Sequence, residues 1–139
     1  MTIGWDDLQE GIELPTREFA PLTRTDIVRY VGASGDMNPI HHDEGYARAA
    51  GFPTVFSAGM LQAGMLATYV TDQLGAANVR RYAVQFREQL WPDDVLVCTG
   101  TVTRRYEDGG ERRVDLALRG TRAASGGAAV LAEATFAVP

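Results

Sequence analysis

The feature that most constrains the fold is a change in hydrophobic periodicity just after Gly75. From Gly59 to Leu74 apolar side chains lie on nearly every side of a helix, and Gly75 is a typical helix-ending residue. A helix that is apolar all round must be buried in the core. From Arg81 to Arg87 apolar residues occupy every second position, which is typical of a strand with one apolar face. The sequence therefore predicts one buried helix followed by a β-sheet.

Four more strands are expected, because β-forming runs are separated by turn sequences at about 12–20, 95–106, 112–122 and 129–138. Closely spaced turns favour antiparallel neighbours joined as a run of hairpins. The predicted class is α+β, with an antiparallel sheet of about five strands packed around the central helix. Because one helix covers only part of such a sheet, we expect at least a dimer.

Two shorter helices are expected before the central one. The sequence Thr23-Arg24-Thr25-Asp26 has the form of a capping box and predicts a helix from about Thr25 to Val31. Gly32 to Pro39 favours a loop, because both glycine and the Asn-Pro pair disfavour helix. Asp43 to Ala50 is expected to be a short helix with Asp43 as its N-cap, and Ser57 is expected to cap the central helix.

Composition narrows the class of protein. The chain has 139 residues, of which 45% are hydrophobic and 22% charged, so residues 1–139 are expected to form a single globular domain. The net charge of −5 argues against a nucleic-acid partner. Without ~20 consecutive apolar residues or a signal-peptide pattern, the chain is expected to be cytoplasmic, with no membrane partner. The single cysteine, Cys98, lies in an apolar run and is expected to be a buried, unreactive thiol.

The densest group of chemically useful residues lies between the first two helices. Asp36 and His41 stand five residues apart in a loop bent by Gly35 and Pro39, so their side chains can meet. A carboxylate and an imidazole that share one water form a general acid–base pair. The alternative is that Asp36 closes an Asx turn before Asn38, with His41 packed beneath it. Spacing alone leaves both interpretations open.

Other chemistry has weaker support. His41, His42, Asp43 and Asp36 are possible metal ligands, but consecutive residues rarely point at one centre and a third histidine is absent, so no metal is expected. Nucleotide-binding glycine motifs are also absent, and no cofactor is expected. The start of the central helix at Gly59 offers unpaired N–H groups to an oxygen that becomes negative, although the residues alone favour an ordinary buried helix start.

Three strings of residues together resemble a known family: Tyr30 to His41, which reads YVGASGDMNPIH, then Gly51-Phe52 and Gly59-Met60-Leu61. They resemble the MaoC-like (R)-specific enoyl-CoA hydratases, also called 3-hydroxyacyl-thioester dehydratases, of the hotdog fold. Within that family the chain is similar to short actinobacterial proteins that include a dehydratase beta subunit. The resemblance runs from about Trp5 to the C-terminus.

The resemblance implies a reaction and a set of site residues. Asp36 and His41 would hold the catalytic water, and the N–H of Gly59 would bind the thioester oxygen. Asn38 and Pro39 would shape the loop. Water would add reversibly to a trans-2-enoyl thioester of CoA or acyl-carrier protein, giving the (R)-3-hydroxyacyl product without a cofactor. The family's dimers imply a homodimer, or a heterodimer with a related subunit.

Two departures and two alternatives accompany the resemblance. The family usually has a histidine directly before the helix-start glycine, where this chain has Ala58, and it offers no role for His42. The hotdog fold also hosts thioesterases, which often place a carboxylate on the central helix. Gly59 to Tyr69 contains none, which favours the hydratase. The other alternative is a non-catalytic subunit of a heterodimeric dehydratase.

Overall fold

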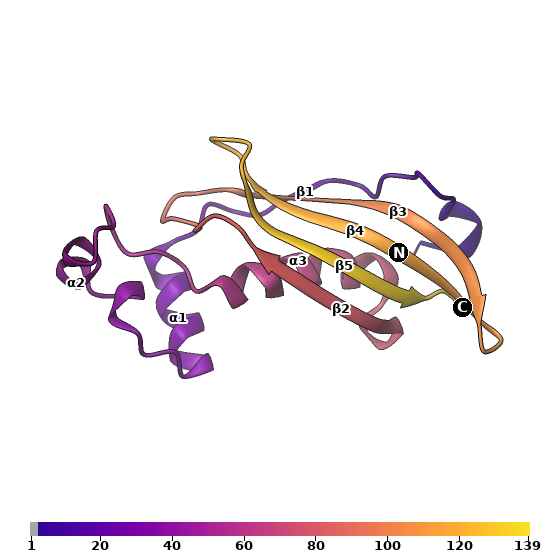
Figure 1. Ribbon diagram of the computed structural model, residues 1–139, viewed down its shortest axis with the longest axis horizontal. Helices are drawn as coiled ribbons and strands as arrows, with labels where there is room; N and C mark the ends of the chain where they lie inside the picture. The colour runs from indigo at the N-terminus through magenta and orange to yellow at the C-terminus, as the bar shows by residue number, and fades with distance from the viewer. Residues whose placement is uncertain (1–2) are drawn as a thin grey trace.

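The computed structural model describes residues 3–139, in which helices come first along the chain and most of the sheet second (Figure 1). The helices and strands are, in chain order, η1 (Trp5–Asp7), β1 (Arg17–Glu18), α1 (Arg24–Ser34), η2 (Pro39–His41), α2 (Glu44–Ala49), α3 (Gly59–Leu74), η3 (Ala76–Asn78), β2 (Val79–Phe86), β3 (Leu96–Asp108), β4 (Glu111–Arg122) and β5 (Ala128–Ala137). The η elements are short 3-10 helices.

One antiparallel sheet of five strands packs on the long helix α3, as expected. The strand order is β1-β3-β4-β5-β2, so β2 is an edge strand. The shorter helices α1 and α2 gather at one end of the sheet, beside the start of α3 (Figure 1). The α+β architecture predicted from the change in periodicity is therefore confirmed.

The expected run of hairpins is wrong at its first step. The turn at 91–94 does not close a hairpin, because β2 pairs with β5 on the far side of the sheet, for example Val84 with Ala132. Asp93 donates its N–H to the Leu22 carbonyl (2.7 Å), and Leu22 donates to the Asp94 carbonyl (2.8 Å). These bonds hold the turn to the segment before α1 instead. The β3–β4 and β4–β5 connections are hairpins as expected.

The strand expected at about 12–20 is almost entirely absent. Only Arg17 and Glu18 form β1, with one isolated bridge from Glu13 to Thr101. Pro15 lies between them and has no N–H to donate to a neighbouring strand. The segment therefore follows the edge of β3 without continuous pairing.

Helix α1 is longer than expected. Thr23 and Asp26 form the predicted reciprocal capping box, with bonds of 2.9 and 3.0 Å. The helix then runs three residues past Val31 and ends where Gly35 takes a left-handed conformation (φ 77°). A glycine inside a helix costs only about 1 kcal/mol, so Gly32 does not stop it. Helix α2 has Asp43 as its N-cap, and α3 has the predicted bounds.

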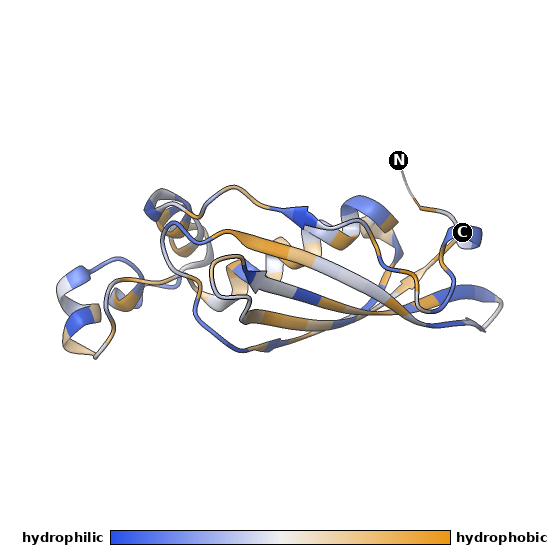
Figure 2. Cartoon of the chain, turned by 90° about the horizontal axis from the view of Figure 1, so that it is seen from above, coloured by the Kyte–Doolittle hydropathy of each residue, from blue (hydrophilic) through white to orange (hydrophobic). Residues whose placement is uncertain are grey.

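The core lies between α3 and the sheet. Leu66, Tyr69 and Val70 of α3 are each at most 1% exposed, and hydrophobic and hydrophilic residues alternate along the long strands (Figure 2). The expectation of all-round burial is wrong at Met60, which is 57% exposed at the start of α3. No helix among residues 3–139 is long and apolar enough to cross a membrane.

Candidate active site

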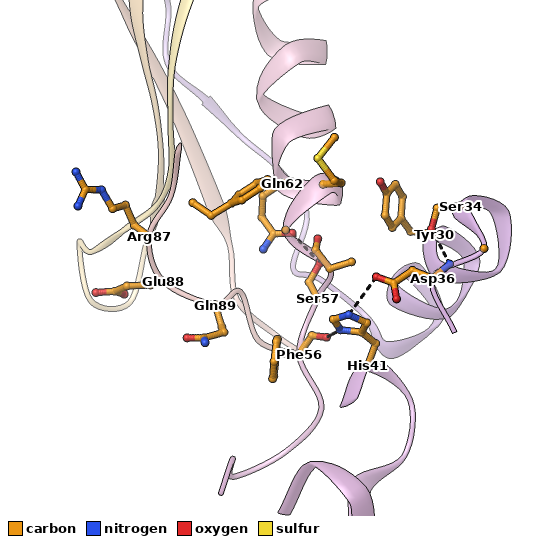
Figure 3. A pocket seen from close by; sticks show the side chains of 15 residues that line it. Tyr30, Ser34, Asp36, His41, Phe56, Ser57, Gln62, Arg87, Glu88 and Gln89 are labelled. Carbon is orange, nitrogen blue, oxygen red and sulfur yellow. Dashed lines mark hydrogen bonds and ion pairs between the residues drawn. The ribbon is translucent and has the colours of Figure 1, made fainter. Parts of the chain in front are cut away.

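A cavity of about 550 Å³ lies at the start of α3, between the loop that follows α1 and the segment that leaves β2 (Figure 3). Its lining combines polar and apolar side chains from segments that are far apart in the sequence. Asp36, His41 and Gly59, which the sequence pattern singles out, all line it. Three sequence-predicted site residues therefore share one cavity.

Asp36 and His41 are in direct contact. His41 Nε2 lies 3.3 Å from Asp36 Oδ2, with side-chain exposures of 9% for the histidine and 42% for the aspartate. The other carboxylate oxygen, Oδ1, accepts the N–H of Asn38 at 3.3 Å, which is an Asx turn. The two interpretations left open by spacing are thus compatible, because one oxygen serves the turn and the other faces the histidine.

The second nitrogen of His41 decides its tautomer. Nδ1 lies 2.7 Å from the Phe56 carbonyl oxygen. A carbonyl can only accept, so Nδ1 carries the proton and donates it. In neutral His41, Nε2 is then an acceptor and faces a carboxylate that is also an acceptor. This arrangement suits a water that donates one hydrogen to each group.

The loop between Asp36 and His41 is built by local bonds. Asn38 caps the short 3-10 helix η2 by accepting the Ile40 N–H at 3.1 Å, and Pro39 occupies its first turn, where an N–H is not needed. The His41 N–H donates to the Asn38 carbonyl at 3.2 Å. Asn38 and Pro39 therefore shape the loop that presents His41.

Gly59 is the first residue of α3, and its N–H donates to no acceptor among residues 3–139. Ala58, the N-cap, makes no side-chain capping bond. A Cβ at Gly59 would lie 3.1 Å from the Phe86 ring, which is tighter than ordinary packing. The close approach at Gly59 is therefore made by Phe86, whose ring would have to shift to admit a Cβ, and the free N–H remains beside the cavity.

Ser57 has a different role from the one expected. It does not cap α3: its hydroxyl donates to Gln62 Oε1 at 2.7 Å, and both side chains are only 2% exposed. Sequence patterns alone miss Gln62, which also lines the cavity. Its only signal is that it is a polar residue interrupting an otherwise apolar stretch. A buried polar side chain on a core helix needs a partner, and Ser57 supplies one.

Aromatic rings pack behind His41. The Phe56 ring meets the imidazole edge to face, with centroids 5.5 Å apart, and also contacts Phe52 and Trp91 at 4.8 and 5.4 Å. These rings limit the movement of the imidazole and exclude water from one side of it. Sequence spacing does not reveal this cluster, because Phe52 and Phe56 lie in the connection before α3 whereas Trp91 lies far along the chain, after β2.

The remaining candidates lie outside the cavity lining. His42 is exposed. Among residues 3–139, no group of three or more His, Cys, Asp or Glu side chains is arranged to hold a metal ion. Cys98 is fully buried in β3, and this burial raises the pKa of its thiol to about 12, so it stays protonated at neutral pH.

An antiparallel sheet packed on one central helix, with a polar cavity at the start of that helix, defines a hotdog-fold protein. The chain belongs to the MaoC-like family: the model of the MaoC like domain matches residues 8–120.

Comparisons with known proteins agree with this assignment. The chain is 28% identical over 138 residues to an (R)-specific enoyl-CoA hydratase of Rhodospirillum rubrum, covering 97% of this chain and 91% of that protein. It is 35% identical over 102 residues to 3-hydroxyacyl-thioester dehydratase Y of Mycobacterium tuberculosis, covering 70% of this chain but 32% of that protein. Its fold is similar to a chain in the crystal structure of the ChsH1-ChsH2 complex from Mycobacterium tuberculosis, with a TM-score of 0.80, 23% identity, and coverage of 94% and 98%.

Proposed function

We propose that this chain catalyses the reversible hydration of trans-2-enoyl thioesters to (R)-3-hydroxyacyl thioesters. The observation that carries the proposal is the arrangement of His41 Nε2 and Asp36 Oδ2, two acceptors 3.3 Å apart on the wall of one cavity. A water donating to both is held with its oxygen directed into the cavity. Membership of the MaoC-like family supports the same class of reaction.

The proposed step balances without a cofactor. One of the two side chains takes a proton from the water while the water oxygen forms a bond to C3 of the enoyl group. The C2–C3 π electrons move toward C1, so negative charge develops on the thioester oxygen. The free N–H of Gly59 donates to that oxygen. A proton then passes from the Asp36–His41 pair to C2, and the reverse sequence dehydrates the product.

We further propose that two chains form the working unit. Met60 and Phe86, which both line the cavity, are 57% and 48% exposed, and Phe86 ends the edge strand β2. A partner packed there would cover both side chains and the open strand edge. The partner is a second copy of this chain, or a related subunit as in the complex of ChsH1 and ChsH2.

The test is hydration of crotonyl-CoA by the purified chain, followed as loss of enoyl absorbance, with the product's configuration determined by chiral chromatography. We expect (R)-3-hydroxybutyryl-CoA. Release of free CoA thiol without hydration would instead identify a thioesterase. Inactivity of the chain alone, with activity on mixing with a related subunit that is unchanged by Asp36→Asn and His41→Ala in this chain, would identify a non-catalytic partner. Parallel assays with the crotonyl acyl-carrier-protein thioester distinguish the two carriers.

A further inference from the structure

The side chain of Gln62 is a buried polar group in the cavity wall that the proposed reaction does not use. It lies three residues after Gly59 on α3, a spacing that puts both on the same side of the helix. It lines the same cavity and is only 2% exposed. A buried carboxamide at this place needs hydrogen-bond partners for both its oxygen and its nitrogen.

Ser57 accounts for the oxygen. Its N–H donates to the Leu90 carbonyl at 2.9 Å, which fixes its backbone, and its hydroxyl donates to Gln62 Oε1 at 2.7 Å, with the Ala58 carbonyl as a second, longer acceptor at 3.2 Å. With the oxygen held in this way, the amide nitrogen points away from Ser57 (Figure 3). In this arrangement the bond from Ser57 orients the carboxamide within the cavity wall.

The nitrogen has no such partner. Gln62 Nε2 donates to no acceptor within residues 3–139, so its two N–H groups are left for whatever occupies the cavity. An aliphatic chain packed against them would leave buried donors unpaired, which is unfavourable. An oxygen acceptor placed there satisfies them. A site built to donate a hydrogen bond discriminates strongly against ligands that lack the acceptor.

We infer that Gln62 is a hydrogen-bond donor that binds an oxygen of the acyl group of the thioester substrate, and that Ser57 positions it. This inference rests on the proposed function. The oxygen belongs either to the thioester carbonyl, which Gln62 then binds together with the Gly59 N–H, or to an oxygen substituent on the acyl chain.

Gln62→Met tests the donor, because methionine has a similar volume and no N–H. Gln73→Met is the matched control: Gln73 lies on the same helix outside the cavity lining, and donates to the Tyr69 carbonyl at 3.0 Å. Both variants are assayed with crotonyl-CoA, whose only acyl oxygen is the thioester carbonyl, and with an enoyl-CoA carrying a keto oxygen on its chain. Gln73→Met should retain wild-type kinetics.

Two results support the inference. If the oxygen is the thioester carbonyl, Gln62→Met lowers kcat on both substrates by about 10²-fold with little change in KM, because charge develops on that oxygen during reaction. If it is a chain oxygen, kcat/KM falls by at least about tenfold on the keto substrate only. Changes under about twofold on both substrates, or a rise in KM alone with crotonyl-CoA, overturn the inference.

Gln62→Glu separates the donor from packing and serves if the methionine variant does not fold. It keeps an oxygen to accept from Ser57 but replaces the N–H groups with a second oxygen. Its activity relative to wild type should rise as pH falls, since a protonated carboxyl regains a donor. If the ratio of Gln62→Glu activity to wild-type activity does not change with pH, the donor role of Gln62 is contradicted. If wild type hydrates neither thioester, binding is measured instead, as calorimetric Kd values for butyryl-CoA and for a saturated keto-acyl-CoA. Weaker binding of at least one ligand by Gln62→Met supports the inference. Equal Kd values in wild type and variant for both ligands overturn it.

Discussion

His41 Nε2 lies 3.3 Å from Asp36 Oδ2 while the opposite nitrogen of the same ring donates to the Phe56 carbonyl. The histidine is thus held by one bond and presents its other nitrogen beside the carboxylate. Because both facing atoms are acceptors in the neutral tautomer, the pair is suited to a water and not to a direct neutral hydrogen bond. The proposed chemistry depends on this relationship.

The first prediction concerns this pair. Asp36→Asn and His41→Ala should each lower kcat for crotonyl-CoA hydration by about 10²–10⁴-fold, because each removes an acceptor for the water. The double variant should be little worse than the poorer single variant, since the two groups act as a unit. His42→Ala, which changes an exposed neighbour, is the control and should be fully active. Wild-type rates in either single variant would refute the assignment.

Gly59→Ala should reduce activity although alanine keeps the backbone N–H. The added Cβ would lie 3.1 Å from the Phe86 ring, so the ring or the start of α3 must shift. Adding Phe86→Leu to Gly59→Ala should restore part of the lost kcat by making room, and Phe86→Leu alone is the control. If the double variant is as impaired as Gly59→Ala, crowding by Phe86 is not the cause. The measurement is steady-state kinetics with thermal unfolding in parallel.

The purified chain should sediment as two chains at micromolar concentration. Phe86→Glu, which puts a charge at the end of the edge strand, should shift the equilibrium toward monomers and lower activity with it. Val28→Glu changes an equally exposed residue on α1 and should leave the assembly unchanged. A wild-type monomer, or equal dissociation in both variants, would contradict an interface at β2. Analytical ultracentrifugation makes the measurement.

Cys98 should resist alkylation in the folded protein at about pH 8. Its thiol is fully buried and burial raises its pKa to about 12, so almost none is thiolate. Labelling with iodoacetamide, followed by mass spectrometry, should be complete only after denaturation. Rapid labelling of the native protein would mean that β3 opens readily.

Glu111 should stabilise the fold in a pH-dependent way. Hydrogen bonds from Arg80 and then Arg113 lower the pKa of its carboxyl from 4.5 to about 2. A lowered folded-state pKa means that the stabilisation is present above pH 4.5 and is lost as pH falls toward 2. Wild type should therefore have a higher Tm than Glu111→Gln at pH 6, and the gap should narrow between about pH 4.5 and 2. If the Tm difference between wild type and Glu111→Gln does not change with pH, the ion pairs of Glu111 with Arg80 and Arg113 are not its source.

Local features were predictable from the sequence. The Thr23–Asp26 capping box, the bounds of α3 and the turn at Gly109 depend on residues close in the chain, and each is present as expected. The contact between Asp36 and His41 was predictable as one of two alternatives, because a short loop limits their separation. Failures occurred where distant segments compete, as where the turn at 91–94 bonds to Leu22 and does not close a hairpin.

By itself, then, the sequence determined most helix and strand types, the bent loop that carries Asp36 and His41, and the resemblance to a family, because periodicity, capping and turn chemistry act over a few residues. Only the tertiary structure decided that β2 lies beside β5, that Phe86 covers Gly59, and that Ser57 holds Gln62 in the cavity wall. Packing of the sheet on α3 brings these segments together, and the free energy of that packing is shared among many residues that no single stretch of sequence contains.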